Sequence, residues 1–250
     1  MTRTIYRITG TDRETFLQGL VTNDVAKLKD GLVYAALLTP QGKYLADFFL
    51  VPEPDAILID LDAAIAGATI KRLSMYKLRA DVNIVETDLH LHRGTGPCPS
   101  DGYADPRHPA LGWRAYRQGA ADEASPQPDW DAIRVQHLIP ETGVELTPDS
   151  FILEAGFERL NGVDFRKGCY VGQEVTARMK HKTELRKGIG QIHLAASVAP
   201  GTELMANGKH AGILHTVAGD HALAYLRFDR ADGGMMAGDV SAKWIRVPAK

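Results

Sequence analysis

Short apolar runs alternate with turn-forming residues through the first two thirds of the chain. Runs of about four to eight apolar or β-branched residues, bounded by Gly, Pro, Asn or Asp, are typical of strands. Such runs predict strands over residues 4–8, 32–38, 44–51, 56–61 and 82–91. Apolar residues at helical spacing predict helices that follow Asp12, run from Asp62 to about Leu78, and cover 130–138 and 153–160.

From residue 188 onward the pattern becomes entirely β. Apolar runs of strand length occupy 188–194, 210–217, 221–227 and 240–247, with turns between them. This pattern predicts a small barrel. Before it, strands and helices alternate irregularly and include a hairpin, which favours an α+β fold over a doubly wound parallel sheet. Residues 119–128 are rich in Gly, Pro and Ala and predict a linker.

The composition is that of an ordinary globular protein. The chain has 250 residues, 44% of them hydrophobic and 24% charged, and its formal net charge is −2. A charge so close to neutral gives no general attraction to nucleic acid or to a membrane, so neither is expected as a partner. The N-terminus lacks the apolar region of a signal peptide, and no apolar run approaches 18 residues. We therefore expect a cytoplasmic location.

The two cysteines, Cys98 and Cys169, are too few for a disulfide scaffold in a chain of this length. A bridge between them is not expected. No Cys/His cluster has zinc-binding spacing, so no metal site is predicted.

Cys169 has the sequence surroundings of a reactive thiol. Gly168 and Gly172 bracket it and favour unusual backbone conformations and the close approach of a ligand. A helix that begins near Gly172 would place Cys169 just before its N-terminus, where the helix dipole favours a thiolate, and Arg166 and Lys167 add positive charge. The alternative is a buried structural cysteine. We predict that Cys169 and Lys167 carry the chemistry.

The segment Lys167 to Glu174, KGCYVGQE, resembles the signature of the YgfZ family, whose members are relatives of the T-protein of the glycine cleavage system (GcvT). Further stretches that are similar to the family lie at 16–25 (FLQGLVTNDV), 38–43, 139–141 and 161–165. The resemblance covers most of residues 14–190, while the last 60 or so residues agree in type more than in motif.

The resemblance implies a GcvT-like α+β fold of three domains around a central funnel. Two are small α+β, ferredoxin-like domains, and the third is a C-terminal β-barrel. On this sequence the first domain would comprise 1–50 with 129–185, the second 51–118, and the barrel 186–250, with 119–128 as the linker.

The resemblance also implies a function. Members of the family bind folate and assist the assembly or repair of iron–sulfur clusters, with the motif cysteine as the functional residue. We therefore expect tetrahydrofolate or a derivative as cofactor, and iron–sulfur proteins or cluster carriers as partners. The residues expected to bind the folate are Asn23, Asp24, Asp47, Gln173, Glu174 and Arg178.

Two alternatives stay open, and with them the question of whether the protein is an enzyme. One is a tetrahydrofolate-dependent aminomethyltransferase. T-proteins tend to carry two adjacent aspartates after the hairpin turn, whereas this chain has Ala46 and Asp47, so one carboxylate is left for that chemistry. The other is a non-enzymatic docking module for cluster carriers that uses the basic segment 166–190.

Overall fold

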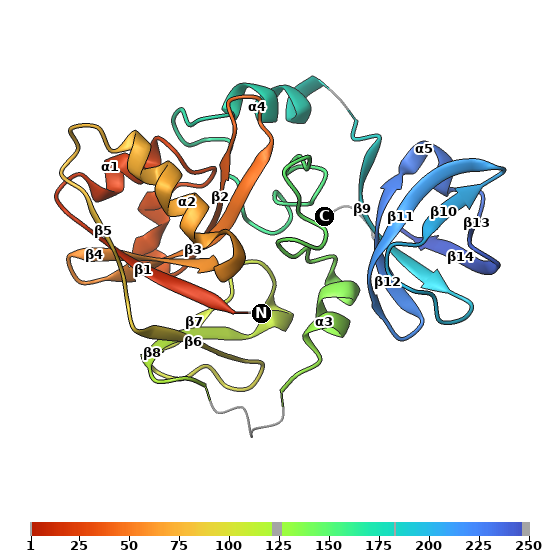
Figure 1. Cartoon of the computed structure of the whole chain (residues 1–250), viewed down its shortest axis with the longest axis horizontal. Helices are drawn as coiled ribbons and strands as arrows, with labels where there is room; N and C mark the ends of the chain where they lie inside the picture. The colour runs from red at the N-terminus through yellow and green to blue at the C-terminus, as the bar shows by residue number, and fades with distance from the viewer. Residues whose placement is uncertain (1, 122–126, 183, 247–250) are drawn as a thin grey trace. The chain divides into compact units, whose positions relative to one another are not determined.

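The computed structural model describes residues 2–121, 127–182 and 184–246, and Figure 1 shows the order of its elements. The chain divides into two compact units, each built from two segments. The first unit comprises residues 1–128 and 157–177, and the second comprises 129–156 and 178–250. Each unit is described separately below. Part of the predicted linker, residues 122–126, lies outside the described residues.

An antiparallel five-stranded sheet forms the core of the first unit, with its strands in the order β2-β3-β4-β1-β5. The strands are β1 Arg3–Thr9, β2 Val33–Leu38, β3 Tyr44–Glu53, β4 Ala56–Asp62 and β5 Asn83–Glu86. All six residues of β2 are buried, which explains its continuous apolar sequence. The strands predicted over 4–8, 32–38, 44–51 and 56–61 are confirmed.

The first unit contains the helix α1 Arg13–Gln18, the 3-10 helix η1 Val25–Asp30 and the helix α2 Ala63–Tyr76. Asp62 caps α2, since its Oδ1 accepts a hydrogen bond from the Ala64 amide at 2.9 Å. The helix packs against β1, β3 and β4 through its buried face. It stops two residues before the predicted end because Leu78 has a φ of +44°, in the left-handed region.

The single strand predicted over 82–91 is wrong. Two strands occupy this range and pair in different sheets: β5 pairs with β1, whereas β6 (Leu89–Gly94) pairs with β8 (Trp113–Gln118). Thr87 lies at the break, where its amide and its hydroxyl both donate to the Ile5 carbonyl at 2.9 Å. A short strand, β7 (Tyr103–Ala104), and the 3-10 helix η2 (Pro109–Leu111) complete this region, and the sheet order is β6-β8-β7.

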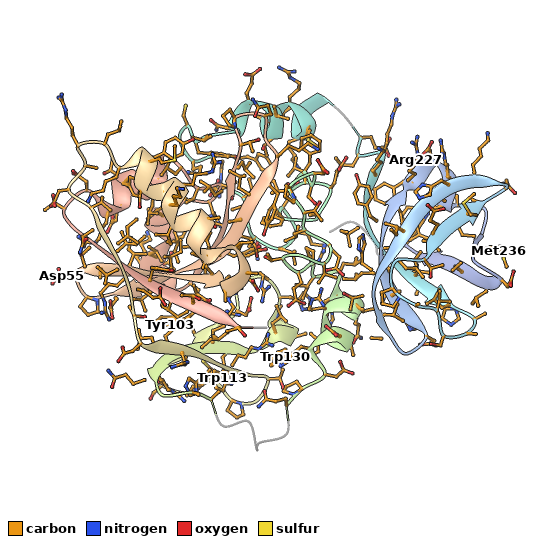
Figure 2. The ribbon with its side chains drawn as sticks, in the orientation of Figure 1. Asp55, Tyr103, Trp113, Trp130, Arg227 and Met236 are labelled. Atoms are coloured by element: carbon orange, nitrogen blue, oxygen red, sulfur yellow. The ribbon has the colours of Figure 1, made fainter. Side chains whose placement is uncertain are left out.

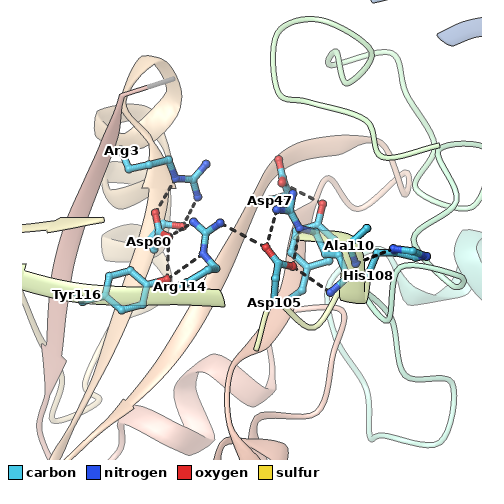
Figure 3. A network of polar contacts seen from close by, with 10 residues as sticks. Arg3, Asp47, Asp60, Asp105, His108, Ala110, Arg114 and Tyr116 are labelled. Carbon is cyan, nitrogen blue, oxygen red and sulfur yellow. Dashed lines mark hydrogen bonds and ion pairs between the residues drawn. The ribbon is translucent and has the colours of Figure 1, made fainter. Parts of the chain in front are cut away.

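A buried ionic cluster joins the two sheets of the first unit (Figure 3). Asp60 on β4 accepts from Arg3 Nε on β1 at 2.6 Å and from Arg114 Nη2 on β8 at 2.5 Å. Tyr116 also donates to Asp60, and Asp105 lies 3.5 Å from Arg114 Nη1. Burial alone would raise the pKa of the Asp60 carboxyl, but the two guanidinium groups hold it below its usual range.

The second unit contains helix α3 (Trp130–His137) and a closed six-stranded barrel in the order β10-β11-β12-β9-β14-β13. Its strands are β9 Lys187–Leu194, β10 Glu203–Ala206, β11 Lys209–Ala218, β12 His221–Arg227, β13 Met235–Ala237 and β14 Val240–Ile245. The predicted helix over 130–138 and the four predicted barrel strands are confirmed, although β14 ends at Ile245. The sequence missed β10, β13 and the four-residue helix α5 (Phe228–Ala231).

The helix predicted over 153–160 is wrong, since turns occupy that segment. Gly156 has a φ of +79°, which a right-handed helix does not allow, so the apolar spacing there reflects burial of successive turns. Among the described residues, no helix is long and apolar enough to cross a membrane.

Candidate functional site

The loop that carries Cys169 borders a surface pocket of about 440 Å³ in the first unit. Helix α1 and the start of η1 form the opposite side. Cys169 is exposed and its thiol is not part of a disulfide, and Cys98 is also exposed and free. The lining residues are Glu14, Thr15, Gln18, Gly19, Asp24, Val25, Ala26, Gly168 and Cys169. The structure therefore places the predicted cysteine beside a hollow and not in an apolar interior.

Lys167 anchors this loop to the end of α1. Its buried Nζ donates to the carbonyl oxygens of Gln18 and Val21, each at 2.6 Å. Burial lowers the pKa of the amine from 10.5 to about 8, although nearby Asp24, Asp164 and Cys169 act in the opposite direction. The amine also lies 4.9 Å from the ring centroid of Tyr170. This geometry gives Lys167 a positioning role, while its predicted part in the chemistry stays a prediction.

Gly172 is fixed by close packing against the turn between β2 and β3. It has a φ of +85°, and a Cβ atom there would lie 2.5 Å from the Thr39 carbonyl oxygen. Helix α4 (Gln173–Lys182) begins directly afterwards, four residues beyond Cys169. By contrast, Gly168 has no left-handed φ, and a Cβ there would meet nothing within 4 Å. The expectation that both glycines need special backbone freedom is therefore right for Gly172 and wrong for Gly168.

Gln18 and Asp24 tie α1 to η1 along the pocket. Gln18 Nε2 donates to Asp24 Oδ1 at 3.0 Å, and Gln18 Oε1 accepts from the Val25 amide at 2.9 Å. Asp24 Oδ1 also caps η1 by accepting from the Ala26 amide. Asp24 is the one predicted folate ligand that lines the pocket.

Asn23 makes hydrogen bonds within the first unit. Its Nδ2 donates to the carbonyls of Tyr34 and Asn161 at 2.8 and 2.7 Å. Its Oδ1 accepts from the Asp24 amide and from Lys27 Nζ. An amide side chain has two donor hydrogens and two acceptor lone pairs, so all of its hydrogen-bonding capacity is used. Asn23 has none left for a ligand.

Asp47 lies on β3, buried beneath two phenols. Its Oδ1 accepts from the Tyr44 hydroxyl at 2.6 Å and its Oδ2 from the Tyr34 hydroxyl at 3.0 Å. Burial raises the pKa of Tyr34 well above its usual value, and the Asp47 carboxylate adds to the effect. Asp47 belongs to the region of the ionic cluster (Figure 3) and does not line the pocket beside Cys169.

The remaining predicted ligands lie on α4. Gln173 is half-buried in its first turn, and Glu174 and Arg178 are exposed. None of the three lines the pocket. Five of the six residues predicted to bind folate belong to the first unit, and among its described residues these five do not converge on one site, while Arg178 belongs to the second unit. No chemical step through folate is derived from them.

Sequence reasoning did not single out Gln18 as a site residue, although it lies in the stretch 16–25 that is similar to the family. Its side-chain amide holds α1 to η1 beside the pocket. The charges in the ionic cluster were also overlooked, although Asp60 inside the apolar strand AILIDLD was a usable signal, because a charge is buried only when it is paired.

The chain is similar to several proteins with known names. Residues 186–249 match the family model described as "CAF17, C-terminal beta-barrel domain". The chain is 30% identical to "Iron-sulfur cluster assembly factor IBA57, mitochondrial" of Mus musculus, over 99% of this chain and 82% of the mouse protein. Identity to the Homo sapiens protein of the same name is also 30%, over 92% and 77%. The Mycosarcoma maydis homolog is 31% identical, over 79% of this chain and 57% of the fungal protein.

A solved structure has the same fold. The crystal structure of the aminomethyltransferase T of the glycine cleavage system from Bartonella henselae superposes on this chain with a TM-score of 0.77. The superposition covers 98% of this chain and 83% of the Bartonella chain. Sequence identity is 14%, so this likeness shows the fold alone. It confirms the predicted α+β, GcvT-like fold with a C-terminal barrel. The predicted domain boundaries and the central funnel stay predictions.

Proposed function

Since the chain belongs to the YgfZ/GcvT-like family, and within it to the iron–sulfur cluster assembly factors related to IBA57, we propose that it assists the assembly or repair of iron–sulfur clusters. One observation carries the proposal. The thiol of Cys169 is exposed beside a pocket, on a loop that Lys167 and Gly172 fix in place.

The chemistry of the site suits a cluster that is passed on and not kept. Thiolates are the preferred soft ligands of iron–sulfur clusters, and a [4Fe–4S] cluster takes about four of them. The chain has two cysteines, and its described residues contain no group of three His, Cys, Asp or Glu side chains that could hold a metal. Cys169 would thus supply one thiolate ligand to iron, and a client or carrier protein would supply the others. As a nucleophile, it would take the outer sulfur of a donor protein's persulfide and release the donor's thiolate.

The surrounding residues keep this thiol available. Two charge-assisted hydrogen bonds from Lys167 attach one end of the loop to α1. Gly172 packs the other end on the hairpin turn. With both ends fixed, the thiol stays at the pocket edge without a large loss of entropy when a partner arrives.

Complementation of cells that lack the protein tests the proposal. We expect the native chain and the matched Cys98→Ser variant to restore the activity of a [4Fe–4S] enzyme such as aconitase. The Cys169→Ser variant should restore less than a fifth of that activity at equal protein level. Full restoration by Cys169→Ser would refute the proposed role of the thiol.

Folate binding is a separate proposal that rests on the family resemblance. Calorimetric titration of the native chain with tetrahydrofolate and its polyglutamate tests it, and the absence of heat at millimolar ligand would reject it.

No observation favours the aminomethyltransferase alternative, whose candidate base Asp47 already accepts two phenolic hydrogen bonds. The cytoplasmic location also stays a prediction, to be checked by cell fractionation, since the IBA57 relatives are mitochondrial by name.

A further inference from the structure

The end of helix α2 presents an unusual apolar surface. Met75 is 70% exposed, Tyr76 36% and Leu78 89%. They are three of the six large hydrophobic side chains that are exposed among the described residues, and they lie within four positions of each other. We call this surface, residues 75–78, the α2 knob. Single exposed apolar residues are ordinary, but a cluster of them marks an interaction surface.

The backbone of the knob is held in a costly conformation. Leu78 has a φ of +44°, in the left-handed region that favours Gly or Asn. The chain therefore places a bulky apolar residue where a small polar one would be more stable, and exposes it almost completely. Strained residues persist where a function requires them, so this outlier indicates a contact that the isolated chain does not make.

Four cations surround the knob. Lys71 and Arg72 are exposed on the last turns of α2, and Lys77 and Arg79 flank Leu78. Among the described residues, none of the four forms an ion pair within 4 Å. An apolar centre with a charged rim is the usual anatomy of a protein interface, and this rim is complementary to an acidic surface.

Tyr76 connects the knob to a pocket beside α1. A second pocket of about 300 Å³ lies between the end of α2 and α1, and its lining includes Tyr76 and Ala80. Thr15 and Gly19 line both this pocket and the one beside Cys169. A partner seated on the knob would therefore extend across α1 to the thiol.

We propose that the α2 knob is the docking surface for an acidic iron–sulfur protein, which seats Leu78 and Met75 in an apolar depression and faces its carboxylates toward Lys71, Arg72, Lys77 and Arg79. This inference rests on the proposed function, since it names the kind of partner that would complete the ligand set of Cys169. An anionic membrane fits less well, because a flat bilayer cannot fill the two pockets beside the knob, whereas a protein surface can.

Photo-crosslinking in cells tests the docking surface. The full chain carries benzoylphenylalanine at position 78, or at position 236 as the control, where Met236 is a 42% exposed apolar residue of the barrel (Figure 2). We expect position 78 to capture an iron–sulfur protein with a clear excess of Asp and Glu. The capture should fall at least fivefold in the Lys71→Glu/Arg72→Glu variant and should be absent from position 236.

Other outcomes overturn the proposal. They are no capture, equal capture from position 236, capture of a second copy of this chain, and capture of a protein that is not acidic. Sedimentation of the purified chain with vesicles containing phosphatidylglycerol, lost in the Lys71→Glu/Arg72→Glu variant, would instead assign the surface to membranes.

Leu78→Asn separates docking from folding, because the two effects have opposite signs. Asparagine tolerates the left-handed conformation, so the melting temperature should rise by about 1–3 °C. Affinity for the captured protein should fall about tenfold, equivalent to about 1.4 kcal/mol. Unchanged affinity would refute the docking role.

Cys169→Ser should keep the crosslink while losing enzyme restoration. Restoration by Cys169→Ser with the crosslink intact would reject the proposed function and keep the docking surface.

Discussion

Replacement of Gly172 by alanine tests whether the cysteine loop is held by steric packing against the hairpin. At this position φ is +85°, and a Cβ atom would lie 2.5 Å from the Thr39 carbonyl oxygen and 2.9 Å from Leu38 Cβ. The Thr39 carbonyl cannot move freely, because it accepts a hydrogen bond from the Gly42 amide. The Thr39 amide in turn donates to the Lys43 carbonyl, which fixes the residue at both of its backbone groups.

The expected cost follows from two contributions. Placing a non-glycine residue in the left-handed region costs about 1–2 kcal/mol. Overpacking against a fixed backbone atom costs about 1–3 kcal/mol. Together they predict a loss of about 2–5 kcal/mol for Gly172→Ala, which lowers the melting temperature by about 4–20 °C for a chain of this size.

Gly168→Ala is the matched control from the same motif. Its new methyl group would meet nothing within 4 Å, and the position has no left-handed φ. We expect its melting temperature to stay within about 2 °C of the native value, or to rise slightly because the unfolded chain loses freedom. Thermal unfolding followed by circular dichroism compares the three proteins. If Gly172→Ala melts like the native chain, or if Gly168→Ala loses as much, the packing argument is wrong.

Three further predictions concern charge and the thiol. The pKa of Lys167 is about 8 in the folded chain and about 10.5 in the unfolded chain, so between these pH values the unfolded state binds more protons than the folded state. The free energy of unfolding of the native chain, compared with that of Lys167→Met, should therefore rise from pH 8 to pH 10. Urea unfolding at several pH values measures the difference, and a decrease over that range would contradict the assignment. Iodoacetamide at neutral pH should label Cys169 faster than Cys98, since Cys169 borders a pocket that can hold the reagent; peptide mass spectrometry gives both rates in one sample, and equal rates would argue against a special role of this pocket. Asp60→Asn should lose about 3–5 kcal/mol because it removes the buried negative charge that balances the guanidinium groups of Arg3 and Arg114, whereas a small loss in urea unfolding would show that the ionic cluster does not fasten the two sheets.

Several elements could be predicted from the sequence because their pattern is local. A buried strand such as β2 needs apolar side chains on both faces, and a cap such as Asp62 acts on the amide two residues ahead. The strand predicted over 82–91 failed for the opposite reason. Its division into β5 and β6 depends on which distant strand pairs with each half, and a local pattern does not contain that information.

The candidate site shows the same division. The motif KGCYVGQE singled out Cys169 and its loop, and the structure places that thiol at a pocket. The roles of Lys167 and Asn23 could not be inferred in the same way, because Lys167 bonds to Gln18 and Val21, and Asn23 to Asn161, across more than a hundred residues of the chain. A lysine beside a cysteine suggests a charge that acts on the thiol, whereas the fold directs its amine to two carbonyls of the α1 segment.

The sequence by itself determined the fold class, most of the strands, the C-terminal barrel and the family motif around Cys169, since each depends on short-range periodicity or on a contiguous motif. Only the tertiary structure decided that Lys167 positions the loop, that the predicted folate ligands do not converge, and that Thr15 and Gly19 line both the pocket beside Cys169 and the pocket beside Tyr76. These features arise where segments distant in sequence meet, and their free energies depend on burial and on hydrogen-bond partners that exist only once the chain has folded.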